Sequence, residues 1–128
     1  MDESKRHRRG MKVRRAVLGD AYVDRAESAK SSFNEPFQEL ITRYAWGEIW
    51  TRPGLPRKTR SLITIGMMVA LNRPDELRLH LRAAANNGVS RKEIQEVLLQ
   101  AAIYCGVPAG VDAFRNAREV FAEIDQRK

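Results

Sequence analysis

Apolar residues recur along most of this chain at the three- and four-residue spacing of a helix that packs one face on a core. The segment from Glu35 to Trp46 shows the pattern most clearly. Its apolar positions are Phe37, Leu40, Ile41, Tyr44 and Ala45. A helix from Asp20 to Lys30 precedes this segment, and residues 51–56 (TRPGLP) form a connection rich in proline and glycine. No segment has the period of two that a half-buried strand requires. The pattern therefore predicts an all-α fold.

The second half of the chain carries clear helix boundaries. Residues 61–71 are apolar on every side of the expected helix, which predicts burial on every side. Pro74 opens the next helix and Gly88 closes it. Ser90 and Glu93 then form a capping box for a helix that runs to residue 105. The last helix is expected to turn these residues inward: Val111, Phe114, Val120, Phe121 and Ile124. We expect one domain over residues 1–128, built as a bundle of antiparallel helix hairpins.

The charge of this 128-residue chain is concentrated at its amino terminus. The net charge is +7, and residues 1–15 contribute +5, from 7 Lys or Arg against 2 Asp or Glu. The rest of the chain lacks a basic helix interleaved with aromatic residues, so we predict no nucleic-acid binding. Residues 1–15 are instead interpreted as a basic arm. Its Val13, together with Val17 and Leu18, is expected to pack on a neighbouring subunit, where its arginines pair with acids.

The cysteine and histidine content limits the chemistry. Cys105 is the only cysteine, so an internal disulfide is impossible, and we expect this residue to be a small core side chain in a reducing cytoplasm. The histidines are His7 and His80, too few for a typical zinc site, and we predict no metal. The longest uncharged stretch, Ser61–Asn72, has 12 residues, well short of the roughly 20 that span a bilayer. We therefore expect no membrane association.

Glu76 and His80 form the first candidate site. On a helical wheel Leu77 and Leu81 make the core stripe and His80 lies at its edge, where an imidazole would be half-buried. A carboxylate four residues away favours the imidazolium, so Glu76 is expected to raise the pKa of His80. The spacing alone is equally typical of an ordinary pair on a helix surface.

A second candidate is the segment Trp46-Gly-Glu48-Ile-Trp50. Aromatic walls around a carboxyl group reduce its hydration, and they would let Glu48 donate a proton near neutral pH. Arg52 and Arg60 lie nearby in the sequence and are suited to holding carboxylates. In the alternative interpretation, the tryptophans anchor the loop to the core while Glu48 and the arginines face water.

Several longer segments resemble the carboxymuconolactone decarboxylase family, which is itself similar to alkylhydroperoxidase D. The resemblance extends over nearly the whole chain. It rests on residues 10–20, 37–43, 46–56 (WGEIWTRPGLP), 59–65, 79–89 (LHLRAAANNGV) and 102–108. When the helix of His80 is laid beside that of alkylhydroperoxidase D, the two reactive cysteines of the peroxidase fall on Arg73 and Glu76. The upstream glutamate of those relatives falls at or near Ser61. Thiol peroxidase chemistry is therefore excluded, whereas the histidine is retained.

The resemblance implies an alkylhydroperoxidase D-like helical fold and decarboxylation of 4-carboxymuconolactone to 3-oxoadipate enol-lactone and CO2, a step of protocatechuate breakdown in the β-ketoadipate pathway. Such a dicarboxylate lactone serves as its own electron sink, so no cofactor is expected. His80 is the proposed general acid or oxyanion donor, oriented by Glu76, and Glu48 is the competing acid. The remaining roles are carboxylate binding by Arg52 and Arg60 and water exclusion by Trp46, Trp50 and Tyr104.

Assembly is the last expectation. The chain is short and rich in apolar helix surface, which favours burial between copies. The resemblance points to a closed homo-oligomer, a trimer or a hexamer. The alternative to an enzyme is a helical homo-oligomeric interaction module with a basic arm and no enzymatic activity.

Overall fold

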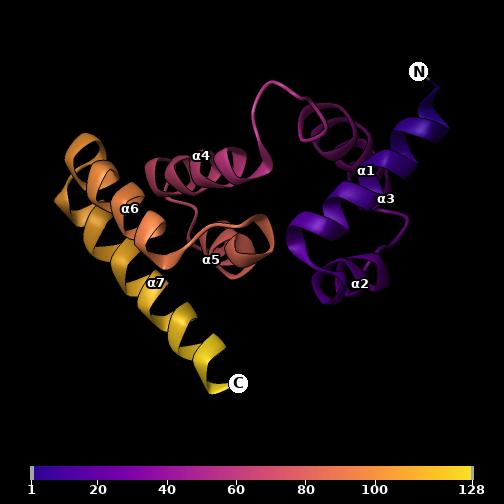
Figure 1. Ribbon diagram of the computed structural model, residues 1–128. Helices are drawn as coiled ribbons and strands as arrows, with labels where there is room; N and C mark the ends of the chain where they lie inside the picture. Colours follow the sequence, from indigo (N-terminus) through magenta and orange to yellow (C-terminus); the bar gives the residue numbers. More distant parts are fainter. Residues whose placement is uncertain (1, 128) are drawn as a thin grey trace. The chain divides into compact units, whose positions relative to one another are not determined.

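The computed structural model describes residues 2–127, in which every regular element is helical and no strand occurs (Figure 1). The all-α prediction is therefore confirmed. The chain forms two compact units, unit 1 up to Arg57 and unit 2 from Lys58 onward. No helix in residues 2–127 is long and apolar enough to cross a membrane.

Unit 1 contains α1 (Glu3–Leu18), α2 (Asp20–Ser28), α3 (Glu35–Ile41) and the π-helix η1 (Thr42–Ile49). The two helices predicted here are confirmed, and the one expected from Glu35 to Trp46 continues as η1 to Ile49. Gly47 serves close packing rather than termination. A Cβ at this position would lie 2.5 Å from the carbonyl oxygen of Arg6 in α1, and a Cβ at Gly10 would overlap the carbonyl oxygen of Thr42. Glycine at both positions therefore lets α1 and η1 pack backbone against backbone.

The amino-terminal arm is part of unit 1, which corrects the sequence interpretation. Residues 3–15 belong to α1, and Val17 and Leu18 are buried within the chain itself, at 0% and 7% exposure. Three of the seven Lys and Arg residues of this segment, together with His7, pair with acids of the same unit. The pairs are Arg6–Glu48, His7–Glu39, Arg14–Glu27 and Arg15–Asp24. The segment is an integral helix of unit 1, because several of its charges and the apolar residues Val17 and Leu18 find partners within one chain.

Unit 2 contains α4 (Arg57–Ala70), α5 (Pro74–Ala83), the 3-10 turn η2 (Ala84–Asn87), α6 (Arg91–Cys105) and α7 (Val107–Gln126). The predicted boundaries are confirmed. Ser90 accepts from the Glu93 backbone at 3.1 Å and donates its own backbone N–H to the Glu93 side chain at 2.9 Å. Gly88 has a φ of 76°, which is the left-handed conformation expected of a helix end. The core contains large aliphatic residues from every helix of the unit: Ile65, Val69, Leu77, Leu81, Ile94, Leu98 and Val120.

The predicted burial of α4 on every side is wrong. Ser61, Ile65 and Val69 face the core, whereas Met67 and Leu71 are 54% and 61% exposed. An apolar helix can be buried only where other elements reach it, and in this chain they cover one stripe of α4.

The inward face of α7 also differs from the prediction. Val120 is fully buried, whereas Val111 and Phe114 are exposed. The cause is the close approach of α6, because a Cβ at Gly110 would lie 2.6 Å from the Cβ of Ala102. Small residues therefore make the contact, and the larger neighbours are turned outward. Cys105, expected in the core, is exposed at the end of α6.

Candidate active site

His80 is a buried histidine on α5. The residue is 8% exposed, and its Nδ1 is a buried atom with no hydrogen-bond partner within residues 2–127. Burial lowers the pKa of His80 from 6.5 to about 4, because an imidazolium would lose its hydration there. The side chain is therefore a neutral imidazole at physiological pH. It can hold or accept a proton, and it can donate one hydrogen bond.

The predicted influence of Glu76 on His80 is wrong. Glu76 lies in the first turn of α5, is exposed, and forms no ion pair with any described residue. His80 belongs to the buried arc of the helix, which also takes in Ala83 and the Asn87 side chain beyond it. The buried arc of this helix is wider than the helical wheel predicted. Desolvation consequently determines the pKa of His80, and its direction is opposite to the one predicted.

Ser61 is a second polar side chain in the core of unit 2. It lies on α4, is 0% exposed, and its Oγ has no hydrogen-bond partner in the described part of the chain. A buried polar atom left unpaired costs roughly 1–3 kcal/mol, and such atoms often mark a site that a ligand or water completes. Ser61 was not predicted to be a site residue. The available signal was the position of the upstream glutamate of the alkylhydroperoxidase D-like relatives, which falls at or near Ser61.

Glu48 and its flanking tryptophans belong to η1 of unit 1. The rings of Trp46 and Trp50 stack on each other with centroids 5.1 Å apart. The Glu48 side chain is 45% exposed, and its Oε2 lies 3.6 Å from Nη1 of Arg6. The predicted enclosure of Glu48 between aromatic walls is therefore wrong, because the tryptophans face each other and the carboxylate faces a guanidinium. The π-helical winding of η1 is itself a feature that recurs at functional sites.

The other predicted residues differ in exposure. Arg52 is exposed in the connection after η1, and Arg60 is half-buried on α4. Tyr104, expected to wall off water, is 84% exposed at the end of α6, so within this chain it encloses nothing. The candidates are divided between the units. Unit 1 holds Trp46, Glu48, Trp50 and Arg52, and unit 2 holds Arg60, Glu76, His80 and Tyr104.

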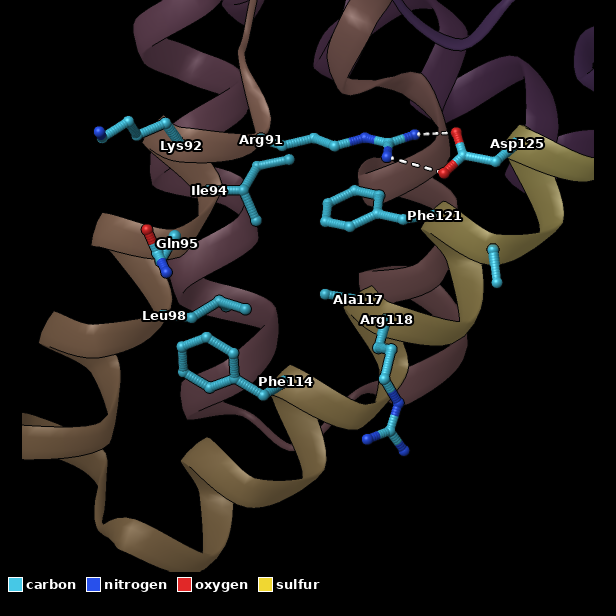
Figure 2. Close-up of a pocket in the computed structure, with 11 residues that line it drawn as sticks. Arg91, Lys92, Ile94, Gln95, Leu98, Phe114, Ala117, Arg118, Phe121 and Asp125 are labelled. Atoms are coloured by element: carbon cyan, nitrogen blue, oxygen red, sulfur yellow. Dashed lines mark hydrogen bonds and ion pairs between the residues drawn. The ribbon is translucent and has the colours of Figure 1, made fainter. Parts of the chain in front are cut away.

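No metal centre is present among residues 2–127, in which no group of three or more His, Cys, Asp or Glu side chains is arranged to hold an ion. Unit 2 has grooves along α6 and α7, and another of about 300 Å³ beside Cys105 and Leu62. None of these grooves is lined by His80 or Ser61. We place the candidate chemistry at the buried imidazole rather than in these grooves, because Nδ1 of His80 is buried without a partner in residues 2–127, whereas Asp125 is held by Arg91 (Figure 2) and Cys105 is exposed.

Comparison with known proteins assigns the chain to a class and then to a family. The helical architecture and a buried neutral histidine define a class of all-α proteins with an acid–base group in the core. Residues 35–119 match the model of the carboxymuconolactone decarboxylase family, a range that includes every predicted site residue. The chain belongs to the carboxymuconolactone decarboxylase family.

Individual relatives are also decarboxylases by name. The chain is 48% identical over 97% of its length to 4-carboxymuconolactone decarboxylase of Acinetobacter baylyi, of which it covers 92%. It is 50% identical over 84% of its length to the nitrosuccinic acid decarboxylase npaB of Metarhizium robertsii, of which it covers 78%. A 4-carboxymuconolactone decarboxylase sequence from Pseudomonas putida matches at 58% identity over 48 residues, 38% of this chain and all of that sequence.

Proposed function

We propose that this protein decarboxylates 4-carboxymuconolactone to 3-oxoadipate enol-lactone and CO2 without a cofactor. The buried neutral imidazole of His80 carries the proposal, because it supplies a proton-handling group within the range that matches the family. The high identity to the Acinetobacter baylyi enzyme over nearly the whole chain supports the choice of substrate.

The reaction requires the protein mainly to bind the substrate and to stabilise developing charge. The bond between the γ-carbon and its carboxylate breaks, and its electron pair moves through the ring double bond into the lactone carbonyl. The resulting dienolate then takes one proton at the α-carbon. The protein must hold two carboxylates, stabilise the charge on the lactone oxygen and deliver that proton.

His80 suits the oxyanion role better than the role of an imidazolium acid. With a pKa of about 4 it carries no charge near neutral pH, and a neutral imidazole N–H in a low-dielectric site is an effective donor to a developing oxyanion. Nδ1 has no partner in residues 2–127, so a substrate oxygen would satisfy it. Glu48 remains the competing acid, and its exposed carboxyl group can exchange protons with solvent.

Two arginines are proposed to bind the substrate carboxylates. Arg52→Ala and Arg60→Ala should each weaken binding of a non-reactive dicarboxylate lactone by roughly 10- to 100-fold, because each removes charge-assisted hydrogen bonds. Titration calorimetry measures the affinity. Arg25→Ala on the exposed face of α2 is the matched control and should leave it unchanged. Full affinity in both variants would place the anion site elsewhere.

The direct test of the proposed function is turnover. Purified protein is mixed with 4-carboxymuconolactone, and CO2 release is recorded together with the ultraviolet absorbance of the lactone. Nitrosuccinate is assayed in parallel, because the Metarhizium robertsii relative is 50% identical to this chain over 84% of its length. Nitrosuccinate is also a dicarboxylate, and its nitro group can accept the electron pair left by CO2. We expect turnover of the lactone to be the faster of the two.

Absence of turnover on both compounds, combined with salt-sensitive retention of nucleic acid, would favour the alternative of an interaction module. The pairing of α1 basic residues with acids of the same unit argues against that alternative, because it leaves fewer cations for a polyanion.

A further inference from the structure

Two polar atoms in the core of unit 2 are buried without a hydrogen-bond partner among residues 2–127. They are Oγ of Ser61 on α4 and Nδ1 of His80 on α5. Ser61 is 0% exposed and His80 is 8% exposed. Buried polar atoms are nearly always paired in folded proteins, so two unpaired atoms in one core indicate that a group from outside the chain completes them.

The hydroxyl of Ser61 differs from three threonine hydroxyls of the same chain. Thr42, Thr51 and Thr64 each donate to the carbonyl oxygen four residues earlier, at 2.7, 2.8 and 2.8 Å. This bond is the usual way for a hydroxyl within a helix to be satisfied. Ser61 does not make it, although Thr64 on the same helix does. Because Ser61 is fully buried, its hydroxyl also lacks bulk water and lies in the packed interior.

The buried faces of α4 and α5 pack on one core. Ser61 lies one helical turn before Ile65, and His80 lies one turn before Ala84, so each shares a helix face with the later residue. Ile65 and Ala84 belong to the same cluster of buried residues. The two unpaired atoms therefore come from faces that border a single apolar cluster, where a hydrogen bond is stronger than it would be in water.

We propose that Ser61 is a second hydrogen-bond donor, beside His80, to the substrate oxygen that receives the electron pair from the breaking bond. The proposal rests on the decarboxylase function proposed above. A carbonyl oxygen has two lone pairs, so it can accept from the Ser61 hydroxyl and from the imidazole N–H of His80 at the same time. Sites that stabilise a developing oxyanion are built from such positioned donors.

Two neutral donors suit the electron flow of this reaction. The electron pair of the bond to the leaving carboxylate ends on the lactone carbonyl oxygen, which becomes the dienolate oxygen. Ser61 donates a hydrogen bond to that oxygen and keeps its own proton, so the proton at the α-carbon still comes from the general acid. The site therefore suits carboxylates whose electron sink ends in an sp2 oxygen, a class that includes both the lactone and nitrosuccinate.

Ser61→Ala tests the proposal through activity and stability together. We expect kcat for the lactone to fall by about 10²-fold, with KM changed far less, because the contact strengthens as charge develops on the oxygen. The urea midpoint of unfolding should stay the same or rise, because the change removes a hydroxyl that is unpaired in the free protein. Thr64→Ala on the same helix is the control and should keep full turnover, since that hydroxyl is bonded to the Arg60 carbonyl.

A double variant tests whether the two donors share one oxygen. Ser61→Ala combined with His80→Ala should lose less turnover than the product of the two single losses, because groups that act on one atom are not independent. A loss equal to that product overturns the proposal, as does an unchanged kcat or a lower urea midpoint in Ser61→Ala. Each of these results leaves the decarboxylase function standing. Absence of turnover by the unaltered protein removes that function and this proposal with it, so the two failures are distinguishable.

Discussion

Replacing His80 with glutamine should lower the turnover number for the lactone by roughly 10²- to 10⁴-fold, the usual contribution of a positioned proton-transfer group. Glutamine has a similar size and still forms hydrogen bonds, but it cannot take up and release a proton. The oxyanion role is tested by His80→Ala, which removes the hydrogen-bond donor that glutamine keeps and should cost about 10²- to 10³-fold. A steady-state assay of kcat and KM measures the effect, and we expect it in kcat because the interaction strengthens in the transition state.

The control for this variant is Glu96→Gln on the exposed surface of α6, which should retain full activity. Far-ultraviolet circular dichroism confirms that each variant is folded. If His80→Gln retains near-full turnover in a folded protein, Glu48 becomes the better candidate for the acid, and Glu48→Gln should then show the loss instead. Glu76→Gln separately tests the orienting role, which the exposure of Glu76 disfavours.

Helix positions could be predicted from the sequence because their signals are local. The capping box of Ser90 and Glu93 and the left-handed Gly88 act within one turn of the chain. Such features fix where a helix begins and ends irrespective of the surroundings. Gly47 shows the limit of this reasoning. Glycine is typical of helix ends, yet at this position it is required because the backbone of Arg6 in another helix leaves no room for a side chain.

Buried faces could be predicted less well, because burial depends on which neighbour arrives. The contact of Gly110 with Ala102 turns Phe114 outward, and no periodicity within α7 contains that information. The same limit applies to Met67 on α4 and Cys105 on α6. Both are residue types that suit a core, but they are exposed because other helices do not reach them.

The role of His80 stays a prediction of the resemblance, and the electrostatics of this residue could not be predicted from the sequence. His80 lies within the residues that match the family model. Its charge state depends on a competition between a nearby carboxylate and burial, which act in opposite directions on the pKa. Spacing showed only the carboxylate, whereas the structure shows a buried imidazole and an exposed Glu76.

The free energy of unfolding should depend on the protonation of His80 between pH 6.5 and pH 4. The folded-state pKa of about 4 lies below the ordinary value of 6.5, so in this window the unfolded chain binds a proton that the folded chain excludes. The stability that neutral His80 contributes to the folded protein is fully present above pH 6.5 and is lost as the pH falls toward 4. A difference of this size corresponds to about 3 kcal/mol at most.

Urea unfolding of the unaltered protein and of His80→Gln, at several pH values from 7 to 4, isolates this contribution. Hydrogen bonds from Lys58 and Arg82 lower the pKa values of Glu93 and Glu123. The stability that these two carboxylates give to the folded protein is therefore also lost in acid. They are present in both proteins, so they cancel in the difference. The unaltered protein should lose stability more steeply than the variant across this window. A difference in unfolding free energy that stays constant with pH would show that His80 takes up its proton in the folded protein as readily as in the unfolded chain, and the neutral-donor role would then lose its physical basis.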